Sequence, residues 1–238
     1  MSPTTKSSIG VSVSKFILGD IHGSYATLMA LIAKLPVTDY SDLVLCGDLI
    51  DRGPRSREVV EFVKSNNIDC VKGNHEDLMI KSEEGEYIEH RPASYVWGMN
   101  GGDQTRDSYK GFEDQYKEHL AWMKTLPLYL EYPEVKNSDG RILVVSHSNI
   151  GKVWDWSNER RTLMSDQFEN TIMWDRYGQE DVPEIYNVVG HSVQREPKIR
   201  SFYACIDTGA VFKQNGYGKL TCLQFPEMFI FSQENCDD

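Results

Sequence analysis

Apolar runs alternate with stretches of helical periodicity through the first eighty residues of the chain. Short apolar runs at 13–18, 43–46 and 68–71 predict buried strands. A helix is predicted behind Ser24, which can act as its cap, and a second helix precedes the third strand. The apolar positions of these helices are Leu28, Leu31, Ile32 and Leu35, then Val59, Phe62 and Val63. Strand–helix–strand alternation predicts parallel pairing with right-handed crossovers.

The second half of the chain is richer in strand-like runs. Between the halves, residues 82–126 are charged and predict a helical cap inserted within the domain, with His90 and His119 facing solvent. Residues 148–184 are irregular and predict a surface loop region near the site. The later predicted strands are 128–132, 142–145, 186–189, 203–206 and 220–225.

Length and composition predict a single domain. A chain of 238 residues is long enough for one sizeable, well-buried core. We expect the domain to span 1–238, with its core at about 13–225 and flexible tails at 1–12 and 233–238. No run has the apolar length of a signal peptide or a membrane span, so we expect no membrane partner. The five cysteines show no Cys-x-x-Cys spacing, which favours reduced thiols and a cytoplasmic protein.

The charge balance excludes some partners. Lys and Arg total 25 against 36 Asp and Glu, for a formal net charge of −11. Such an acidic chain has no general attraction for nucleic acid, so we expect none as a partner. Any phosphate that it binds must be held by local cations, either metal ions or particular arginines.

Polar side chains of the metal-ligand type follow the predicted strands. The first three strands run into Gly-Asp-Ile-His-Gly at 19–23, Gly-Asp-Leu-Ile-Asp-Arg-Gly at 47–53 and Gly-Asn-His-Glu at 73–76. Two later strands run into Ser146-His147 and Gly190-His191. Because the carboxyl ends of parallel strands meet at one edge of a sheet, we expect these side chains to gather there. The candidate metal ligands are Asp20, His22, Asp48, Asn74, His147 and His191.

This set of side chains predicts a two-metal hydrolytic centre. A carboxylate such as Asp48 can bridge two divalent ions about 3.5–4 Å apart, and the pair activates water for in-line attack. Oxygen and nitrogen ligands without thiolate favour Mn²⁺, Fe or Zn²⁺ over a structural zinc site. We expect two divalent metal ions per chain, and Mn²⁺ is the favoured metal. Alone, His147 would be interpreted as a core histidine, but its strand-end position, matched by His191, favours a ligand.

The three early blocks match, without a mismatch, the motifs of the phosphoprotein phosphatase family, which the chain therefore resembles. The resemblance covers about 13–225, more weakly between 81 and 127, and the segment 206–210 is similar to a later family block. It is greatest to compact phage and bacterial members, including the phage lambda-type phosphatase; a phage-encoded protein would act in the host cytoplasm. The resemblance implies an α/β, calcineurin-like metallophosphoesterase fold, with two mixed β-sheets sandwiched between helices and a helical cap at 82–126.

The resemblance also assigns the ligands to two metals. Asp20, His22 and Asp48 would hold one metal ion. Asp48, Asn74, His147 and His191 would hold the other, and a hydroxide between the two ions would attack phosphorus.

Four further residues receive catalytic roles from the resemblance. His75 would protonate the departing alkoxide, and Asp51 would orient His75. Arg52 would hold phosphate oxygens. The second arginine of the family best corresponds to Arg176, with Arg160 and Arg161 as rivals in the same region. Ser148 and Asn149, where many members carry small residues, could narrow the approach to the metals or contact substrate.

The first hypothesis for function is a metal-dependent phosphatase of phosphoserine and phosphothreonine in proteins or peptides, also active on phosphotyrosine and small aryl phosphates. The alternative is a symmetrical bis(5'-nucleosyl)-tetraphosphatase or another phosphoanhydride or phosphodiester hydrolase, which the motifs alone separate poorly. Arg52 in its Asp-Arg-Gly block argues mildly against generic phosphodiesterases and nucleases. A third hypothesis is a catalytically silent binding module, against which the intact ligand set argues. The sequence does not determine the oligomeric state.

Overall fold

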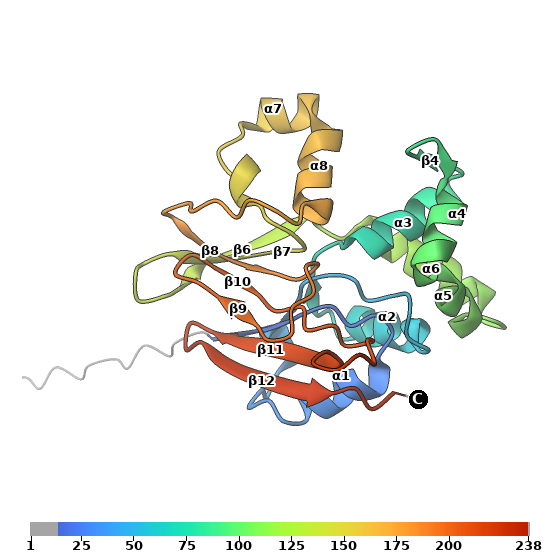
Figure 1. Cartoon of the computed structure of the whole chain (residues 1–238), viewed down its shortest axis with the longest axis horizontal. Coiled ribbons are helices and arrows are strands. Elements are labelled where there is room, and N and C mark those ends of the chain that lie inside the picture. The colour runs from blue at the N-terminus through green and yellow to red at the C-terminus, as the bar shows by residue number, and fades with distance from the viewer. Residues whose placement is uncertain (1–13, 238) are drawn as a thin grey trace, which may run out of the picture.

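Two five-stranded β-sheets lie at the centre of the molecule, with helices outside both (Figure 1). The structure is a computed structural model, and it describes residues 14–237. The first sheet has the order β12-β11-β1-β2-β3 and the second the order β6-β7-β8-β10-β9. Both sheets contain parallel and antiparallel pairs, which confirms the predicted α/β fold with two mixed sheets between helices.

The first sheet contains the three strands predicted in the amino-terminal part. These strands, β1 (Lys15–Leu18), β2 (Leu43–Leu45) and β3 (Asp69–Cys70), pair in parallel as the alternation predicts. The carboxyl-terminal strands β11 (Lys219–Phe225) and β12 (Phe229–Glu234) extend the sheet antiparallel. The crossovers are α1 (Tyr25–Ile32) and α2 (Ser56–Ser65), with the short 3-10 helix η1 (Tyr40–Asp42) before β2.

The second sheet is built from the later part of the chain. Strands β7 (Ile142–Ser146), β8 (Ile185–Val189) and β10 (Tyr203–Cys205) run parallel. The antiparallel edge strands are β6 (Tyr129–Lys136) and β9 (Lys198–Ile199).

Alternation along the strands produces separate apolar layers. Ile17 of β1 packs between the two sheets with residues such as Val145 and Val188, whereas its neighbour Leu18 packs against the helices. Successive strand residues point to opposite faces, so each sheet is covered on both sides. The strand ends that carry polar residues are therefore held by buried β-structure on either side.

The inserted segment 82–126 packs chiefly against α2 and against α3 (Asn74–Glu83). Beside helices it contains a short hairpin that the sequence pattern did not predict. Its elements are β4 (Tyr87–Ile88), β5 (Arg91–Pro92), α4 (Ala93–Trp97), the π-helix η2 (Gly98–Gly102), α5 (Asp103–Ser108) and α6 (Glu113–Lys124). No helix within residues 14–237 combines the length and apolar character needed to cross a membrane.

His119 in α6 is buried, so the prediction that it faces solvent is wrong. Its Nε2 lies 2.9 Å from Oε2 of Glu61 in α2, and its Nδ1 lies 2.7 Å from the hydroxyl of Tyr109. The packing of α6 on α2 turns this side chain inward. His90, in the hairpin, is exposed as predicted.

The region 148–184 is largely helical, which corrects the prediction of a surface loop. It contains η3 (Gly151–Val153), α7 (Asn158–Leu163) and α8 (Ser165–Trp174). Phe168 and Ile172, one helical turn apart, pack against Val144 and Ile185 of the second sheet. That apolar face, hidden among charged residues, explains why the helix forms.

The carboxyl-terminal end makes contacts that the sequence did not indicate. Strand β12 reaches Glu234, and the Asp237 carboxylate accepts hydrogen bonds at 2.9 Å from the backbone N–H groups of Ala26 and Thr27. These N–H groups open α1 and need acceptors, because the first turn of a helix offers none. Ser24 occupies the N-cap position, but its side chain makes no capping bond, so Asp237 replaces it. The predicted tail at 1–12 lies outside the described residues.

Candidate metal centre and active site

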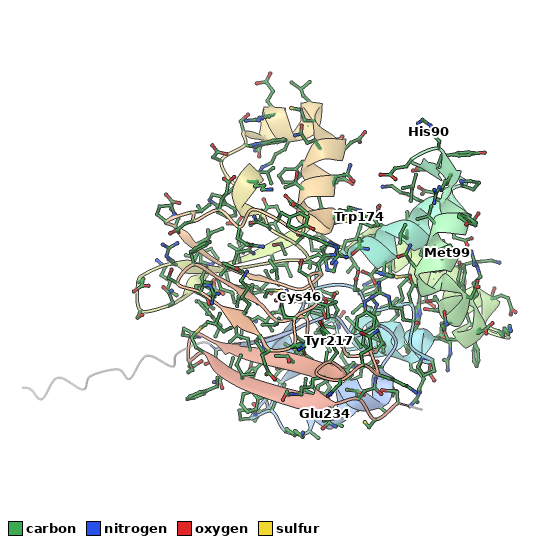
Figure 2. All side chains as sticks on the ribbon, viewed as in Figure 1. Cys46, His90, Met99, Trp174, Tyr217 and Glu234 are labelled. Atoms are coloured by element: carbon green, nitrogen blue, oxygen red, sulfur yellow. The ribbon has the colours of Figure 1, made fainter. Side chains whose placement is uncertain are left out.

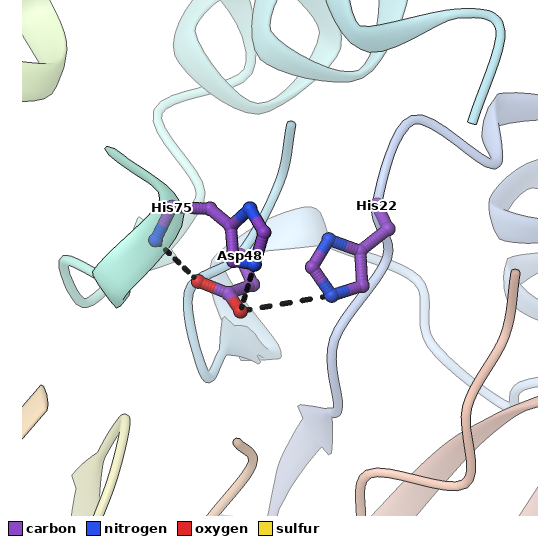
Figure 3. A group of neighbouring side chains, drawn as sticks. All are labelled: His22, Asp48 and His75. Atoms are coloured by element: carbon purple, nitrogen blue, oxygen red, sulfur yellow. Dashed lines mark hydrogen bonds and ion pairs between the residues drawn. The ribbon is translucent and has the colours of Figure 1, made fainter. Parts of the chain in front are cut away.

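The six predicted metal ligands converge from both sheets. Asp20 and His22 follow β1, Asp48 follows β2, and Asn74 opens α3 behind β3. His147 follows β7 and His191 follows β8. Ligand atoms of Asp20, Asp48 and His147 lie within 4.8 Å of one another, as do those of His22, Asp48 and His75 (Figure 3). All seven side chains are buried.

Each of the three histidines predicted as metal ligands is oriented by a backbone carbonyl. Nδ1 of His22 donates to the carbonyl of Ile50 at 2.9 Å, and Nδ1 of His147 donates to that of Cys46 at 2.7 Å. His191 uses its other nitrogen, since Nε2 donates to the carbonyl of Trp174 at 3.1 Å. One ring nitrogen of each histidine is thereby left as an acceptor pointing into the centre. Such an outer hydrogen bond is the usual way in which a metal-ligating imidazole is fixed.

The acceptors that meet in the centre fit divalent metal ions. Nε2 of His147 and Nδ1 of His191 each lie 2.8 Å from Oδ1 of Asn74. The Asp48 carboxylate lies 3.4 Å from Nε2 of His147 and 3.6 Å from Nε2 of His22. Lone pairs that face one another at these distances repel unless a cation lies between them. The His, Asp and Asn groups are therefore suited to a binuclear metal site with Asp48 in its middle.

The charges in the centre also favour bound cations. Burial raises the pKa of Asp20 well above its usual range, and the charges of Asp207 and Asp48 raise it further. Burial also raises the pKa of Asp207, to about 6. Burial lowers the pKa of His191 to about 3, which keeps its ring neutral and able to bind a metal. The buried Asp20 and Asp207 carboxyl groups therefore resist ionisation, and divalent cations bound in the centre would stabilise their charged form.

Several site residues adopt a backbone conformation that is unusual for non-glycine residues. His22, Asp48, Asp51, Arg52 and His191 have φ angles of 47°, 51°, 74°, 68° and 63°. Non-glycine residues in this region are uncommon, and they concentrate where function requires a particular side-chain direction. The sharp turns after β1, β2 and β8 are thus part of how the ligands are aimed.

Beside the metal ligands, His75 and Asp51 form a hydrogen-bonded pair. Nδ1 of His75 donates to Oδ2 of Asp51 at 2.6 Å. Burial lowers the pKa of His75, but the charge of Asp48 and the bond to Asp51 outweigh it, so the pKa is raised. Trp97 Nε1 donates to Asp51 at 3.0 Å and the Thr105 hydroxyl donates to it at 2.6 Å. The sequence did not indicate Trp97 or Thr105, because both come from the inserted segment.

Arg52 lies directly over the two histidines of the first blocks. Its guanidinium donates through Nη1 to Nε2 of His22 at 2.6 Å and through Nη2 to Nε2 of His75 at 2.8 Å. Its backbone N–H donates to the carbonyl of Gly101 at 3.1 Å. Gly101 has φ +100°, and a Cβ there would lie 2.7 Å from the Arg52 nitrogen. The close approach of the inserted segment therefore requires glycine, and it fixes the backbone of Arg52.

Arg176 lies next to the predicted metal ligand His191, whereas its rivals do not. Nη1 of Arg176 donates to the backbone carbonyl of His191 at 2.7 Å. The Arg160 guanidinium stacks 3.9 Å from the ring centroid of Trp156. Arg161 donates to the hydroxyl of Tyr129 at 2.7 Å. Of the three arginines, Arg176 is the one that the structure brings to the centre.

The side chains of Ser148 and Asn149 hydrogen-bond to the loop that carries Arg176. Both side chains are buried. The Ser148 hydroxyl donates to the carbonyl of Asp175, and Nδ2 of Asn149 donates to the carbonyl of Gly178 at 2.6 Å. That either residue narrows the approach to the metals or contacts substrate stays a prediction.

Two further acidic residues support the centre without a role predicted from sequence. Glu76, fully buried, accepts hydrogen bonds from the backbone N–H groups of Asp48, Leu49 and Gly73 at 2.8–2.9 Å. It thereby joins the second and third blocks. Asp207 is buried beside Asp20. Both lie inside blocks that matched the family, and that match was the signal that could have identified them.

Comparison with known proteins agrees with this geometry. Residues 16–202 match the calcineurin-like phosphoesterase family. The asymmetrical bis(5'-nucleosyl)-tetraphosphatase PrpE of Halalkalibacterium halodurans is 32% identical, covering 91% of this chain and 92% of that protein. The PrpE of Bacillus subtilis is 30% identical over 89% of this chain and 91% of that protein. The symmetrical enzyme of Vibrio vulnificus is 30% identical, but only 54% of its length is covered.

Solved structures share the fold. A candidate diadenosine tetraphosphatase superposes with a TM-score of 0.61 at 20% identity, over 96% of both chains. A protein serine/threonine phosphatase from Saccharomyces cerevisiae gives a TM-score of 0.58 at 14% identity, over 96% of this chain and 82% of that one. At such identities the similarity shows the fold alone.

Fold and site together define a metal-dependent phosphoester hydrolase. The chain belongs to the calcineurin-like phosphoesterase family. The predicted resemblance is therefore confirmed for the calcineurin-like family as a whole. It is not confirmed for the phosphoprotein phosphatases in particular, because the similar sequences described above are named as tetraphosphatases.

Proposed function

We propose that this protein hydrolyses dinucleoside tetraphosphates, and that it cleaves them asymmetrically. The observation that carries the proposal is sequence similarity along nearly the whole chain to enzymes named for that reaction. The symmetrical enzyme aligns over about half of its own length, so it supports symmetrical cleavage less well. The phosphoprotein phosphatase hypothesis rests on shared motifs and on a fold similarity at 14% identity, which makes it the second candidate.

The proposed reaction adds water across a phosphoanhydride bond. The water oxygen bonds to phosphorus, the bond from phosphorus to the bridging oxygen breaks, and the departing nucleotide takes that oxygen. Two divalent ions, which we propose to be Mn²⁺, would be held by Asp20, His22, Asp48, Asn74, His147 and His191 and would supply Lewis-acid stabilisation and an acidified water.

The residues around the metal ligands supply the remaining chemistry. Protonated His75, held by Asp51, would deliver a proton from Nε2 to the bridging oxygen, and its raised pKa keeps that proton available. The two N–H groups that Arg52 directs to His22 and His75 can instead pair with two oxygens of a phosphoryl group. Arg176 would contribute a second cation on the His191 side of the centre.

A comparison of substrates tests the proposal. The Mn²⁺-loaded protein is assayed with diadenosine tetraphosphate and with a phosphoserine peptide, and the products are separated by ion-exchange chromatography. We expect a kcat/KM for the dinucleotide at least about tenfold higher, with ATP and AMP as products. ADP as the only product would overturn the asymmetrical assignment. A preference for the phosphopeptide would overturn the proposal itself, and Asp48→Asn protein controls for contaminating activity.

A further inference from the structure

A closed loop between Asp207 and β11 brings an aromatic side chain to the edge of the centre. The backbone N–H groups of Phe212 and Gly218 both donate to the carbonyl of Gly209, at 2.9 and 3.0 Å. The intervening residues, Val-Phe-Lys-Gln-Asn-Gly-Tyr at 211–217, therefore form a compact loop. Tyr217, labelled in Figure 2, lies within this loop.

Phe212 is held in this loop and faces Arg52. Its ring centroid lies 5.7 Å from Cζ of Arg52 and 6.3 Å from the ring of Tyr217, at an interplanar angle of 72°. Gly209 has φ +68°, and a Cβ there would lie 2.7 Å from the Phe212 ring. The Phe212 ring therefore packs directly on the backbone of Gly209. It remains partly exposed beside Arg52.

An open groove lies between Phe212 and the inserted segment. Its volume is about 380 Å³, within the range of small-molecule sites. Met99 of the inserted segment, labelled in Figure 2, also lines the groove and is 72% exposed. The groove is lined by Arg52, Met99, Asn100, Gly101, Gln104 and Phe212. An aromatic face, a thioether and two carboxamides suit a flat heterocycle with polar edges.

A smaller hollow adjoins this groove and shares Arg52 and Gln104 with it. It has a volume of about 180 Å³, and Ser24 and Lys213 are among its lining residues. The Ser24 hydroxyl is buried and has no hydrogen-bond partner within residues 14–237, because Asp237 caps α1 in its place. An unpaired buried hydroxyl costs free energy, which a ligand that hydrogen-bonds to it would recover. The hollow thus offers polar contacts next to the flat groove.

We propose that the groove between Phe212 and the inserted segment is a nucleoside subsite, in which Phe212 stacks on the base of the nucleotide whose phosphate Arg52 holds. The inference rests on the proposed function for its dinucleotide substrate. Ser24 and Lys213 would contact the ribose and phosphate in the adjoining hollow. Arg52 connects the candidate active site with the groove, since it contacts both His75 and Phe212. Phe212 is therefore a specificity-determining residue for base-bearing substrates.

Direct binding of two ligands that differ only in the base tests this subsite. Calorimetry on the Mn²⁺-loaded protein compares AMP with ribose 5-phosphate. Stacking of a base on an aromatic ring predicts that AMP binds at least about tenfold more tightly. Phe212→Ala should bring the ratio of the two dissociation constants towards one, and Phe212→Trp should restore it. The matched control is Phe229→Ala, which removes a 61% exposed phenylalanine of β12 and should leave the ratio as in the wild type.

The outcomes separate this inference from the proposed function. Equal affinity of the wild type for AMP and ribose 5-phosphate, or no measurable binding of AMP, overturns the subsite even if diadenosine tetraphosphate is hydrolysed. An unchanged ratio in a folded Phe212→Ala variant, checked by its thermal melting, also overturns it. A preference for AMP that depends on Phe212 supports the subsite, even if the substrate comparison favours the phosphopeptide.

Discussion

Asp51 lies 2.6 Å from Nδ1 of His75, and the inserted segment holds its carboxylate in place. Trp97 donates to both carboxylate oxygens at 3.0 Å, and Thr105 donates to one of them at 2.6 Å. The segment therefore positions the Asp51 carboxylate that holds His75, in addition to packing on α2 and α3.

Replacement of His75 should remove the proton donor but leave the metal ligands intact. We expect His75→Asn to lower kcat by about 10²–10⁴-fold with a phosphoserine peptide, whose alkoxide is a poor leaving group. General acid catalysis contributes about that much. The loss should be smaller with p-nitrophenyl phosphate, whose leaving group needs less protonation. Steady-state kinetics on both substrates, with metal content measured in parallel, check this prediction.

Unchanged turnover of the poor leaving group by His75→Asn would contradict the acid role. Trp97→Phe serves as a companion variant, since it keeps an aromatic ring but removes one donor to Asp51. Its loss of kcat should be smaller than that of His75→Asn, and the pH dependence of kcat should shift.

Asp48 should be essential for holding the metal pair. Its carboxylate lies between His22 and His147, so Asp48→Asn removes the one charge that both metal positions would share. We expect fewer than two metal equivalents per chain by plasma mass spectrometry, with a large loss of activity. Two full equivalents in a folded Asp48→Asn protein would contradict the bridging assignment.

Arg176 and Arg160 offer a matched pair of arginines from the same region. Arg176 contacts the backbone of His191, whereas Arg160 stacks on Trp156. We expect Arg176→Ala to lower kcat/KM by about tenfold or more. A tenfold loss corresponds to about 1.4 kcal/mol of transition-state stabilisation. Arg160→Ala should stay within a factor of two or so. A larger loss from Arg160→Ala would reassign the second arginine.

The parts of the site that sequence predicts well are short blocks at strand ends. Each block carries its own turn and side chains, so Asp20, Asp48 and His191 could be placed from a local pattern. The buried strands β1 and β8 were predictable for the same reason, since an apolar run bounded by a turn is a local signal.

Contacts made across long sequence separations were not predictable. Trp97 reaches Asp51 and Asp237 reaches Thr27 only after the fold has formed. The periodicity of α8 was masked by neighbouring charges, and β12 has few buried side chains to mark it. Tertiary packing decides such features, and local pattern carries little information about them.

His119 should stabilise the packing of α6 on α2, and its contribution to the free energy of unfolding should decrease as the pH falls. The neutral ring donates from Nε2 to Glu61 and accepts from the Tyr109 hydroxyl at Nδ1. We expect His119→Ala to lower the free energy of unfolding by about 1–3 kcal/mol at pH 7.5, because the buried Tyr109 hydroxyl loses its hydrogen-bond partner and Glu61 loses a partly exposed one.

Burial lowers the pKa of His119 in the folded protein, so below its ordinary value of about 6.5 the unfolded chain binds a proton that the folded chain does not. Stability from this residue is therefore fully present above pH 6.5 and is lost as the pH falls below it. Glu61, whose pKa is lowered to about 2 chiefly by its hydrogen bond with Ser65, stays ionised throughout this range. Urea unfolding at pH 7.5 and 5.5 should show the difference between wild type and His119→Ala narrowing at the lower pH. A difference that widens would contradict the assignment, and His90→Ala, which removes an exposed histidine of the hairpin, is the control substitution.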